Sequence, residues 1–95
     1  MAHMLARLRN VKLAVVKRRL AADAPEHAAD GLFVEHLWQN IDDPDEVLFL
    51  FRVTDPDQAR ESIARRHRAA LEKDPRANLP TMIFLDEANV FAYAR

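Results

Sequence analysis

Residues 46–54, EVLFLFRVT, constrain the fold of this chain more than any other stretch. In a β-strand, successive side chains point to opposite faces of the sheet. One face of this run would carry Val47, Phe49, Phe51 and Val53, and the other would carry Leu48, Leu50 and Arg52. Because both faces are largely apolar, a strand here is expected to be covered on both sides.

The preceding run, LFVEHLWQNI, predicts a second strand, and the turn sequence DDPD separates the two. Strict alternation would place on one face Leu32, Val34, His36, Trp38 and Asn40. A hairpin closed around residues 41–46 would then bring Trp38 beside Phe49. It would also bring His36 beside Phe51, on the same face of the sheet.

A helix is predicted after Val11, because apolar residues recur there every three or four positions. These residues are Leu13, Val16, Leu20 and Ala24. Pro25 cannot continue the helix unbroken. Asp23 is therefore expected to cap a new turn, with Glu26 three residues further on. Gly31, the only glycine of the chain, suits the left-handed position that follows a helix.

A second helix is predicted from Asp55, with Pro56 at its first position, to about Lys73. Its apolar positions are Ala59, Ile63, Ala70 and Leu71. His67 follows Ile63 by four positions and so borders the buried stripe.

Two further strands, one near each end of the chain, complete the pattern. The first covers residues 4–10, with Met4, Ala6 and Leu8 on one side, and the second covers residues 79–87. Residues 88–95 form a tail in which a short strand is expected around Val90 to Tyr93. Residues 1–3 are interpreted as a cloning remnant ahead of Met4.

The predicted order is β-α-β-β-α-β, which is the ferredoxin-like α+β pattern with a four-stranded antiparallel sheet in a single domain, residues 4–87. Two helices cover only one face of such a sheet. The other face is too apolar to remain in water. The simplest prediction is a homodimer in which a second copy covers that face.

Composition narrows the class of protein. The chain has 95 residues and no cysteine, which excludes disulfides and thiolate metal sites. No apolar stretch is long enough to span a membrane, and no signal peptide is visible, so a cytoplasmic protein without membrane contact is expected. Basic residues crowd positions 7–19, but the net charge is −1 and residues 23–57 are acidic. Nucleic acid is therefore not an expected partner, although a basic helix leaves it as an alternative.

The stretch NIDDPDEVLFLFRVTDPDQARESI, residues 40–63, resembles the hairpin and second-helix entry of the dimeric α/β-barrel proteins, relatives of the antibiotic biosynthesis monooxygenases. EHAADGLFVEHLWQN and PTMIFLDE are similar to their first-helix exit and last strand. The likeness covers residues 4–87. It implies a homodimer whose two sheets form a barrel, with a cavity between sheet and helices. Activities in such families include cofactor-free oxygenation of aromatic molecules, haem degradation, cyclisation and isomerisation.

His36 and Trp38 are the candidate site residues for an oxygenase. A histidine in an apolar cavity suits general base catalysis because its proton affinity lies near neutral pH. Trp38 and the phenylalanines Phe49 and Phe51 would hold a substrate ring. The alternative is that His36 and Trp38 simply pack in the dimer core.

The haem-degrading branch supplies a second alternative. It carries a histidine on the second helix as iron ligand and an asparagine at the end of the first strand, which His67 and Asn10 resemble. It also carries a tryptophan on the second helix, which is missing here because Trp38 lies in a predicted strand. No cofactor is therefore expected. His67 and Asn10 remain candidates for contacts with a substrate, and the alternative for His67 is a half-exposed side chain among arginines.

Charged residues inside apolar strands are costly unless they are paired or hydrated. Arg52 and Asp86 are two such residues. They could pair with each other, Arg52 could anchor an anionic substrate, or each could form a salt bridge at the sheet edge or the dimer interface, which is the favoured alternative. Glu26, His27 and Asp30 form a group expected to be solvated rather than to bind a metal. No metal site is predicted.

Two functions remain open. The first is a small enzyme or binding protein for a hydrophobic, aromatic small molecule, resembling a cofactor-independent monooxygenase. The second is a non-catalytic homodimer for stress response or interaction, whose core is filled and which has no pocket of ligand size.

Overall fold

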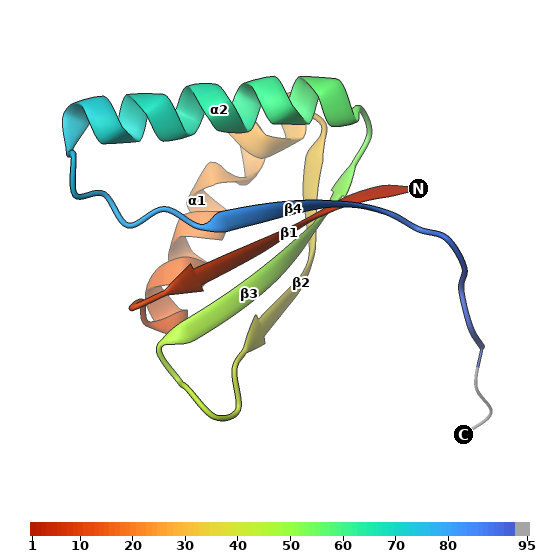
Figure 1. Ribbon diagram of the computed structural model, residues 1–95, viewed down its shortest axis with the longest axis horizontal. Helices are drawn as coiled ribbons and strands as arrows, with labels where there is room; N and C mark the ends of the chain where they lie inside the picture. Colours follow the sequence, from red (N-terminus) through yellow and green to blue (C-terminus); the bar gives the residue numbers. More distant parts are fainter. Residues whose placement is uncertain (93–95) are drawn as a thin grey trace.

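Figure 1 shows the computed structural model of the chain, which describes residues 1–92. Its elements are β1 (Ala2–Arg9), α1 (Leu13–Ala29), β2 (Leu32–Gln39), β3 (Glu46–Val53), α2 (Pro56–Lys73) and β4 (Thr81–Asp86). The strands form one antiparallel sheet in the order β2-β3-β1-β4. This order and topology confirm the predicted ferredoxin-like α+β fold.

The core lies between the sheet and the two helices. One face of β1 and β3 supplies Met4, Ala6, Val47, Phe49, Phe51 and Val53, all buried. Val16 of α1 and Ala59 of α2 belong to the same buried cluster, so both helices pack on this face. We call it the helix face, and we call the opposite face of the sheet the open face.

The pairing of β2 with β3 differs from the prediction. Trp38 lies opposite Leu48, and His36 lies opposite Leu50, because the register shifts at a β-bulge between Val34 and His36. A bulge inserts one extra residue, and a shift of one residue moves every later side chain to the other face. His36 and Trp38 therefore lie on the open face, and the predicted pairs with Phe49 and Phe51 are wrong.

Helix α1 also departs from the prediction, because it runs through Pro25 to Ala29. Proline removes the hydrogen bond that residue 25 would donate to the carbonyl of Ala21. The helix nevertheless continues because Leu20 and His27, seven residues apart, both stay on the face that packs on the sheet. Asp23 caps no new turn; it lies within α1.

Gly31 has the left-handed conformation predicted for it, with φ of 74°. Its N–H donates to the carbonyl of Ala28 at 3.0 Å, which closes the end of α1. A Cβ atom at this position would collide with the Thr54 hydroxyl oxygen. The position therefore requires glycine both for its backbone angle and for space.

Helix α2 begins as predicted: the Asp55 carboxylate accepts from the N–H groups of Asp57 and Gln58, and Pro56 is the first helical residue. Leu71, predicted to face inward, is 43% exposed, and Ser62 is one of the buried residues of α2. Within the described part of the tail, residues 87–92, there is no strand; Tyr93 lies outside the described residues. Within residues 1–92, no helix is long and apolar enough to cross a membrane.

Candidate functional site

Small-molecule sites in proteins usually have volumes of about 300–1,000 Å³. A cavity of ≈ 520 Å³ lies on the helix face, between the sheet and both helices. Its apolar lining comes from every layer of the fold. The sheet contributes Leu8, Phe49, Phe51 and Met82, and the helices contribute Val16, Leu20, Ile63 and Ala70. We call this space the helix-side cavity.

Two histidines, one from each helix, border the helix-side cavity: His27 of α1 and His67 of α2. The ring of His27 meets Phe51 edge-on, with 5.2 Å between ring centroids. Burial lowers the pKa of His27, and the nearby Arg66 charge lowers it further. Burial also lowers the pKa of His67. Since ordinary histidine titrates near pH 6.5, both rings are neutral at pH 7.

Neutral imidazoles offer one N–H donor and one acceptor each. The Nδ1 atom of His27 is buried and has no hydrogen-bond partner among the described residues. A buried polar atom without a partner carries a free-energy cost that a suitable guest or water can relieve. The helix-side cavity therefore combines an apolar floor with hydrogen-bonding capacity at its edge.

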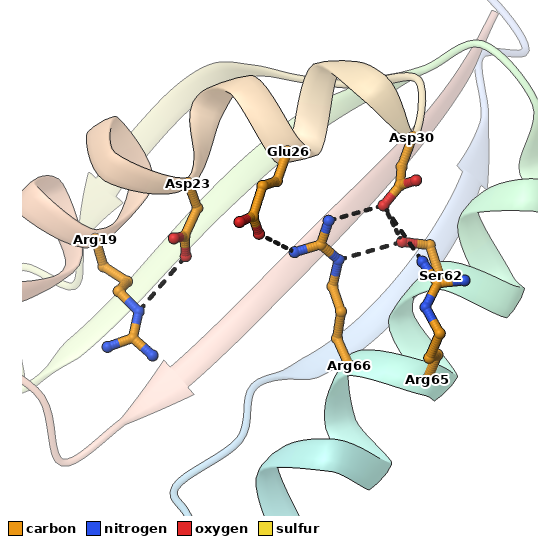
Figure 2. A network of polar contacts seen from close by, with 7 residues as sticks. All are labelled: Arg19, Asp23, Glu26, Asp30, Ser62, Arg65 and Arg66. Carbon is orange, nitrogen blue, oxygen red and sulfur yellow. Dashed lines mark hydrogen bonds and ion pairs between the residues drawn. The ribbon is translucent and has the colours of Figure 1, made fainter.

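A network of charged groups ties the end of α1 to α2, as Figure 2 shows. Two of its members, Glu26 and Arg66, also border the cavity. The Asp30 carboxylate accepts from the Ser62 hydroxyl at 2.6 Å and from Arg66 Nη2 at 2.7 Å. Arg66 Nε also donates to the Ser62 hydroxyl at 3.2 Å, and Nη1 donates to Glu26 at 3.3 Å. Further along α1, Arg19 pairs with Asp23 at 3.5 Å. This network fixes the separation of the two helices at one end of the cavity.

The Asp30 network predicts a loss of stability in acid. Hydrogen bonds from Arg66, then from Ser62, hold the pKa of Asp30 below its usual value. Such a carboxylate stabilises the fold fully above its unfolded pKa of about 4, and the contribution is lost as pH falls through the lower folded value. We expect Asp30→Asn to lower the free energy of unfolding by about 1–2 kcal/mol at pH 7. In urea unfolding experiments between pH 7 and about pH 2, the free energy of unfolding of Asp30→Asn should fall less steeply toward acid pH than that of the wild type.

Asp23→Asn is the matched control, because the Arg19–Asp23 pair is exposed and joins residues of one helix. It should change the free energy of unfolding by only a few tenths of a kcal/mol, or about 0.5 at most. If Asp30→Asn changed the free energy of unfolding as little as this control does, or if it kept the pH dependence of the wild type, the network would not hold the helices together.

The open face carries rows of side chains that cross all four strands. The central row is His36, Leu50, Leu5 and Ile83, from β2 to β4. The rows on either side are Trp38, Leu48, Arg7 and Thr81, and Phe33, Arg52, His3 and Leu85. Trp38, Ile83 and Leu85 are 46%, 47% and 44% exposed, so within one protomer much of this apolar surface meets solvent.

Polar groups of the open face are already engaged with one another. Arg52 lies over the Phe33 ring, 4.5 Å from its centroid, and 4.0 Å from the Glu35 carboxylate. Glu35 also lies 3.2 Å from His3. The His36 ring stacks on Trp38, with centroids 5.0 Å apart.

Arg52 and Asp86 do not pair with each other, which was one of the predicted arrangements. Asp86 lies 3.7 Å from the N-terminal amine, whereas Arg52 uses Glu35. The two residues belong to opposite faces, since Asp86 aligns with Ala2 and Arg52 with His3. The other predicted outcome, separate ion pairs at the sheet, is the one observed.

The structure divides the predicted site residues between two faces of the sheet. His36, Trp38 and Arg52 lie on the open face, whereas Phe49, Phe51 and His67 line the helix-side cavity. Asn10 is exposed at the end of β1, with a left-handed φ of 57°. The predicted combination of His36 as base with Phe49 as ring wall is therefore not assembled within one protomer.

His27 is the site residue that the sequence analysis missed, because the Glu26, His27 and Asp30 group was expected to be solvated. The sequence does contain an indication of its position, because His27 follows Leu20 by seven residues and a continuous helix would place both on one face. The break expected at Pro25 removed this relation from the prediction. Across residues 1–92, no group of three or more histidine or carboxylate side chains is placed to hold a metal ion.

The chain was compared with known proteins at the level of sequence. It matches no protein-family model, and no curated protein is significantly similar to it.

Proposed function

We propose that this protein is a homodimer that holds a small hydrophobic, aromatic molecule in the helix-side cavity of each protomer. The observation that carries the proposal is a ≈ 520 Å³ space with an apolar floor and two neutral imidazoles at its edge. Ligand sites in proteins are typically concave, mainly apolar, and supplied with a few polar groups of this kind.

Dimerisation is proposed from the open face. Its central row is apolar from Leu50 to Ile83, and contiguous apolar surface of this kind marks an interaction site. A second copy covers it with an identical face, as two-fold symmetric contacts do. The likeness of residues 40–63 to the dimeric α/β-barrel proteins supports the same arrangement.

A reaction would take place in this cavity, where the imidazoles of His27 and His67 can accept a proton from a bound molecule. This arrangement is compatible with oxygenation without a cofactor, which is one of the activities found in the families that the chain resembles. The rival function, a non-catalytic dimer with a filled core, is disfavoured by the size of the helix-side cavity.

Fluorescence of the neutral aromatic probe N-phenyl-1-naphthylamine tests the binding site. We expect the wild-type protein to bind it with enhanced, saturable emission. Ala70→Phe should abolish this binding, because Ala70 lines the cavity and the added ring would fill it. Ala69→Phe is the matched control on the exposed side of α2 and should bind as the wild type does. Equal binding by both variants would place the probe elsewhere and overturn the assignment.

A further inference from the structure

The polar side chains at the edge of the helix-side cavity indicate which chemical class of ligand it would bind. Resting on the proposed function, we infer that the cavity selects neutral aromatic molecules that carry a hydroxyl group, received by His27 and His67, over aromatic molecules that carry a carboxylate.

The two imidazoles are free to serve a guest. Among residues 1–92, neither ring has a hydrogen-bond or ion-pair partner, and the contact of His27 with Phe51 is a T-shaped ring contact. They come from different helices and border the same space. A guest between the helices thus meets hydrogen-bonding atoms from two sides.

A hydroxyl is the group best matched to these rings. In a neutral imidazole one nitrogen donates and the other accepts, and either tautomer can occur. A hydroxyl can both donate and accept, so it pairs with either tautomer. The Nδ1 atom of His27 is buried. Rotation of the ring by ~180° about the Cβ–Cγ bond exchanges Nδ1 with Cδ2, so the ring can turn a nitrogen toward the guest without a movement of the helix.

The arginines of the cavity argue against an anionic guest. Arg66 already binds Asp30 and Glu26, and Arg19 is paired with Asp23. Since Asp23 and Glu26 themselves border the cavity, a guest carboxylate would meet negative charge beside each arginine. To bind it, the protein would have to break ion pairs that hold α1 to α2, or to leave the guest charge poorly compensated.

The aromatic part of the guest is accommodated by the floor. Phe49 and Phe51 present rings at 69° to each other with centroids 5.7 Å apart. Edge-to-face contacts of this kind favour another flat ring over a branched aliphatic group.

Three naphthalene derivatives test the inference by displacing N-phenyl-1-naphthylamine from the wild-type protein: 2-naphthol, its methyl ether and 2-naphthoate. We expect 2-naphthol to bind about two- to tenfold more tightly than the ether, which cannot donate a hydrogen bond. We expect 2-naphthoate to bind most weakly. His27→Phe and His67→Phe should each reduce the preference for the hydroxyl while the probe still binds. His36→Phe, on the open face, should leave the preference unchanged.

Proton–carbon NMR of the imidazoles gives a second readout that needs no variant, since the chain has 4 histidines. Addition of 2-naphthol should shift the signals of His27 and His67, and the ether should shift them less. Equal affinity for 2-naphthol and its ether, tightest binding of 2-naphthoate, or a preference that survives both histidine variants would each overturn the inference. Those results would leave the proposed function intact provided that the probe still binds. Failure of the probe to bind the wild type would instead overturn both.

Discussion

If the proposed homodimer forms through the open face, Leu50→Asp is expected to convert it to monomers. Leu50 lies in the central row of the open face, between Leu5 of β1 and His36 of β2. In an isologous interface the substitution occurs on both copies, so two carboxylates enter the same apolar contact. Burying an unpaired charge costs several kcal/mol per ion. The dimer dissociation constant should rise by at least about 100-fold, which corresponds to about 2.7 kcal/mol.

Analytical ultracentrifugation over a range of protein concentrations measures this change. Leu71→Asp is the matched control, because Leu71 is 43% exposed on α2, which packs on the opposite face of the sheet. It should remain dimeric. A dimer that tolerates Leu50→Asp would show that the open face is not the contact between copies.

Phe51→Ala is expected to cause the largest loss of stability. Phe51 is 2% exposed, lies opposite Met4 and Val34 in the sheet, and contacts Phe49 and His27 through its ring. Truncation of a buried phenylalanine removes its transfer free energy and leaves a void, at a cost of about 3–5 kcal/mol. That is a large part of the 5–15 kcal/mol, roughly, by which a domain of this kind is stable.

Urea unfolding at a fixed protein concentration measures the loss, since the stability of a dimer depends on concentration. Leu71→Ala serves as control and should change the free energy of unfolding by less than about 0.5 kcal/mol, because its side chain is half exposed. A loss below about 1 kcal/mol for Phe51→Ala would mean that the core between sheet and helices is loosely packed.

The order of helices and strands along the chain could be predicted from the sequence, because residues close to each boundary determine where an element begins or ends. Asp55 and Pro56 specify the start of α2, Gly31 the end of α1, and the DDPD turn the hairpin. Each of these signals acts over a few residues, so it is visible without any knowledge of the tertiary structure.

The sequence could not predict which side chains of β2 lie on which face of the sheet, because the alternation of apolar and polar residues does not reveal a bulge. Val34 and His36 differ by two positions and were assigned to one face, yet the extra residue between them separates their faces. This single shift moved His36 and Trp38 away from Phe49, and with them the predicted catalytic arrangement.

Only some of the residues that line the helix-side cavity were predicted as site residues. Phe49, Phe51 and His67 were among them, but His27 was not, because Pro25 was expected to break the helix that α1 continues. A local rule predicts a break at proline, whereas packing of Leu20 and His27 on the same face outweighs one missing hydrogen bond.

A native mass spectrum recorded in the presence of N-phenyl-1-naphthylamine tests dimerisation and ligand binding together. We expect a species at twice the chain mass of 10.9 kDa that carries the probe, one molecule for each occupied cavity. A bare dimer would contradict the binding site, and a monomer at 10.9 kDa would contradict the covering of the open face by a second copy.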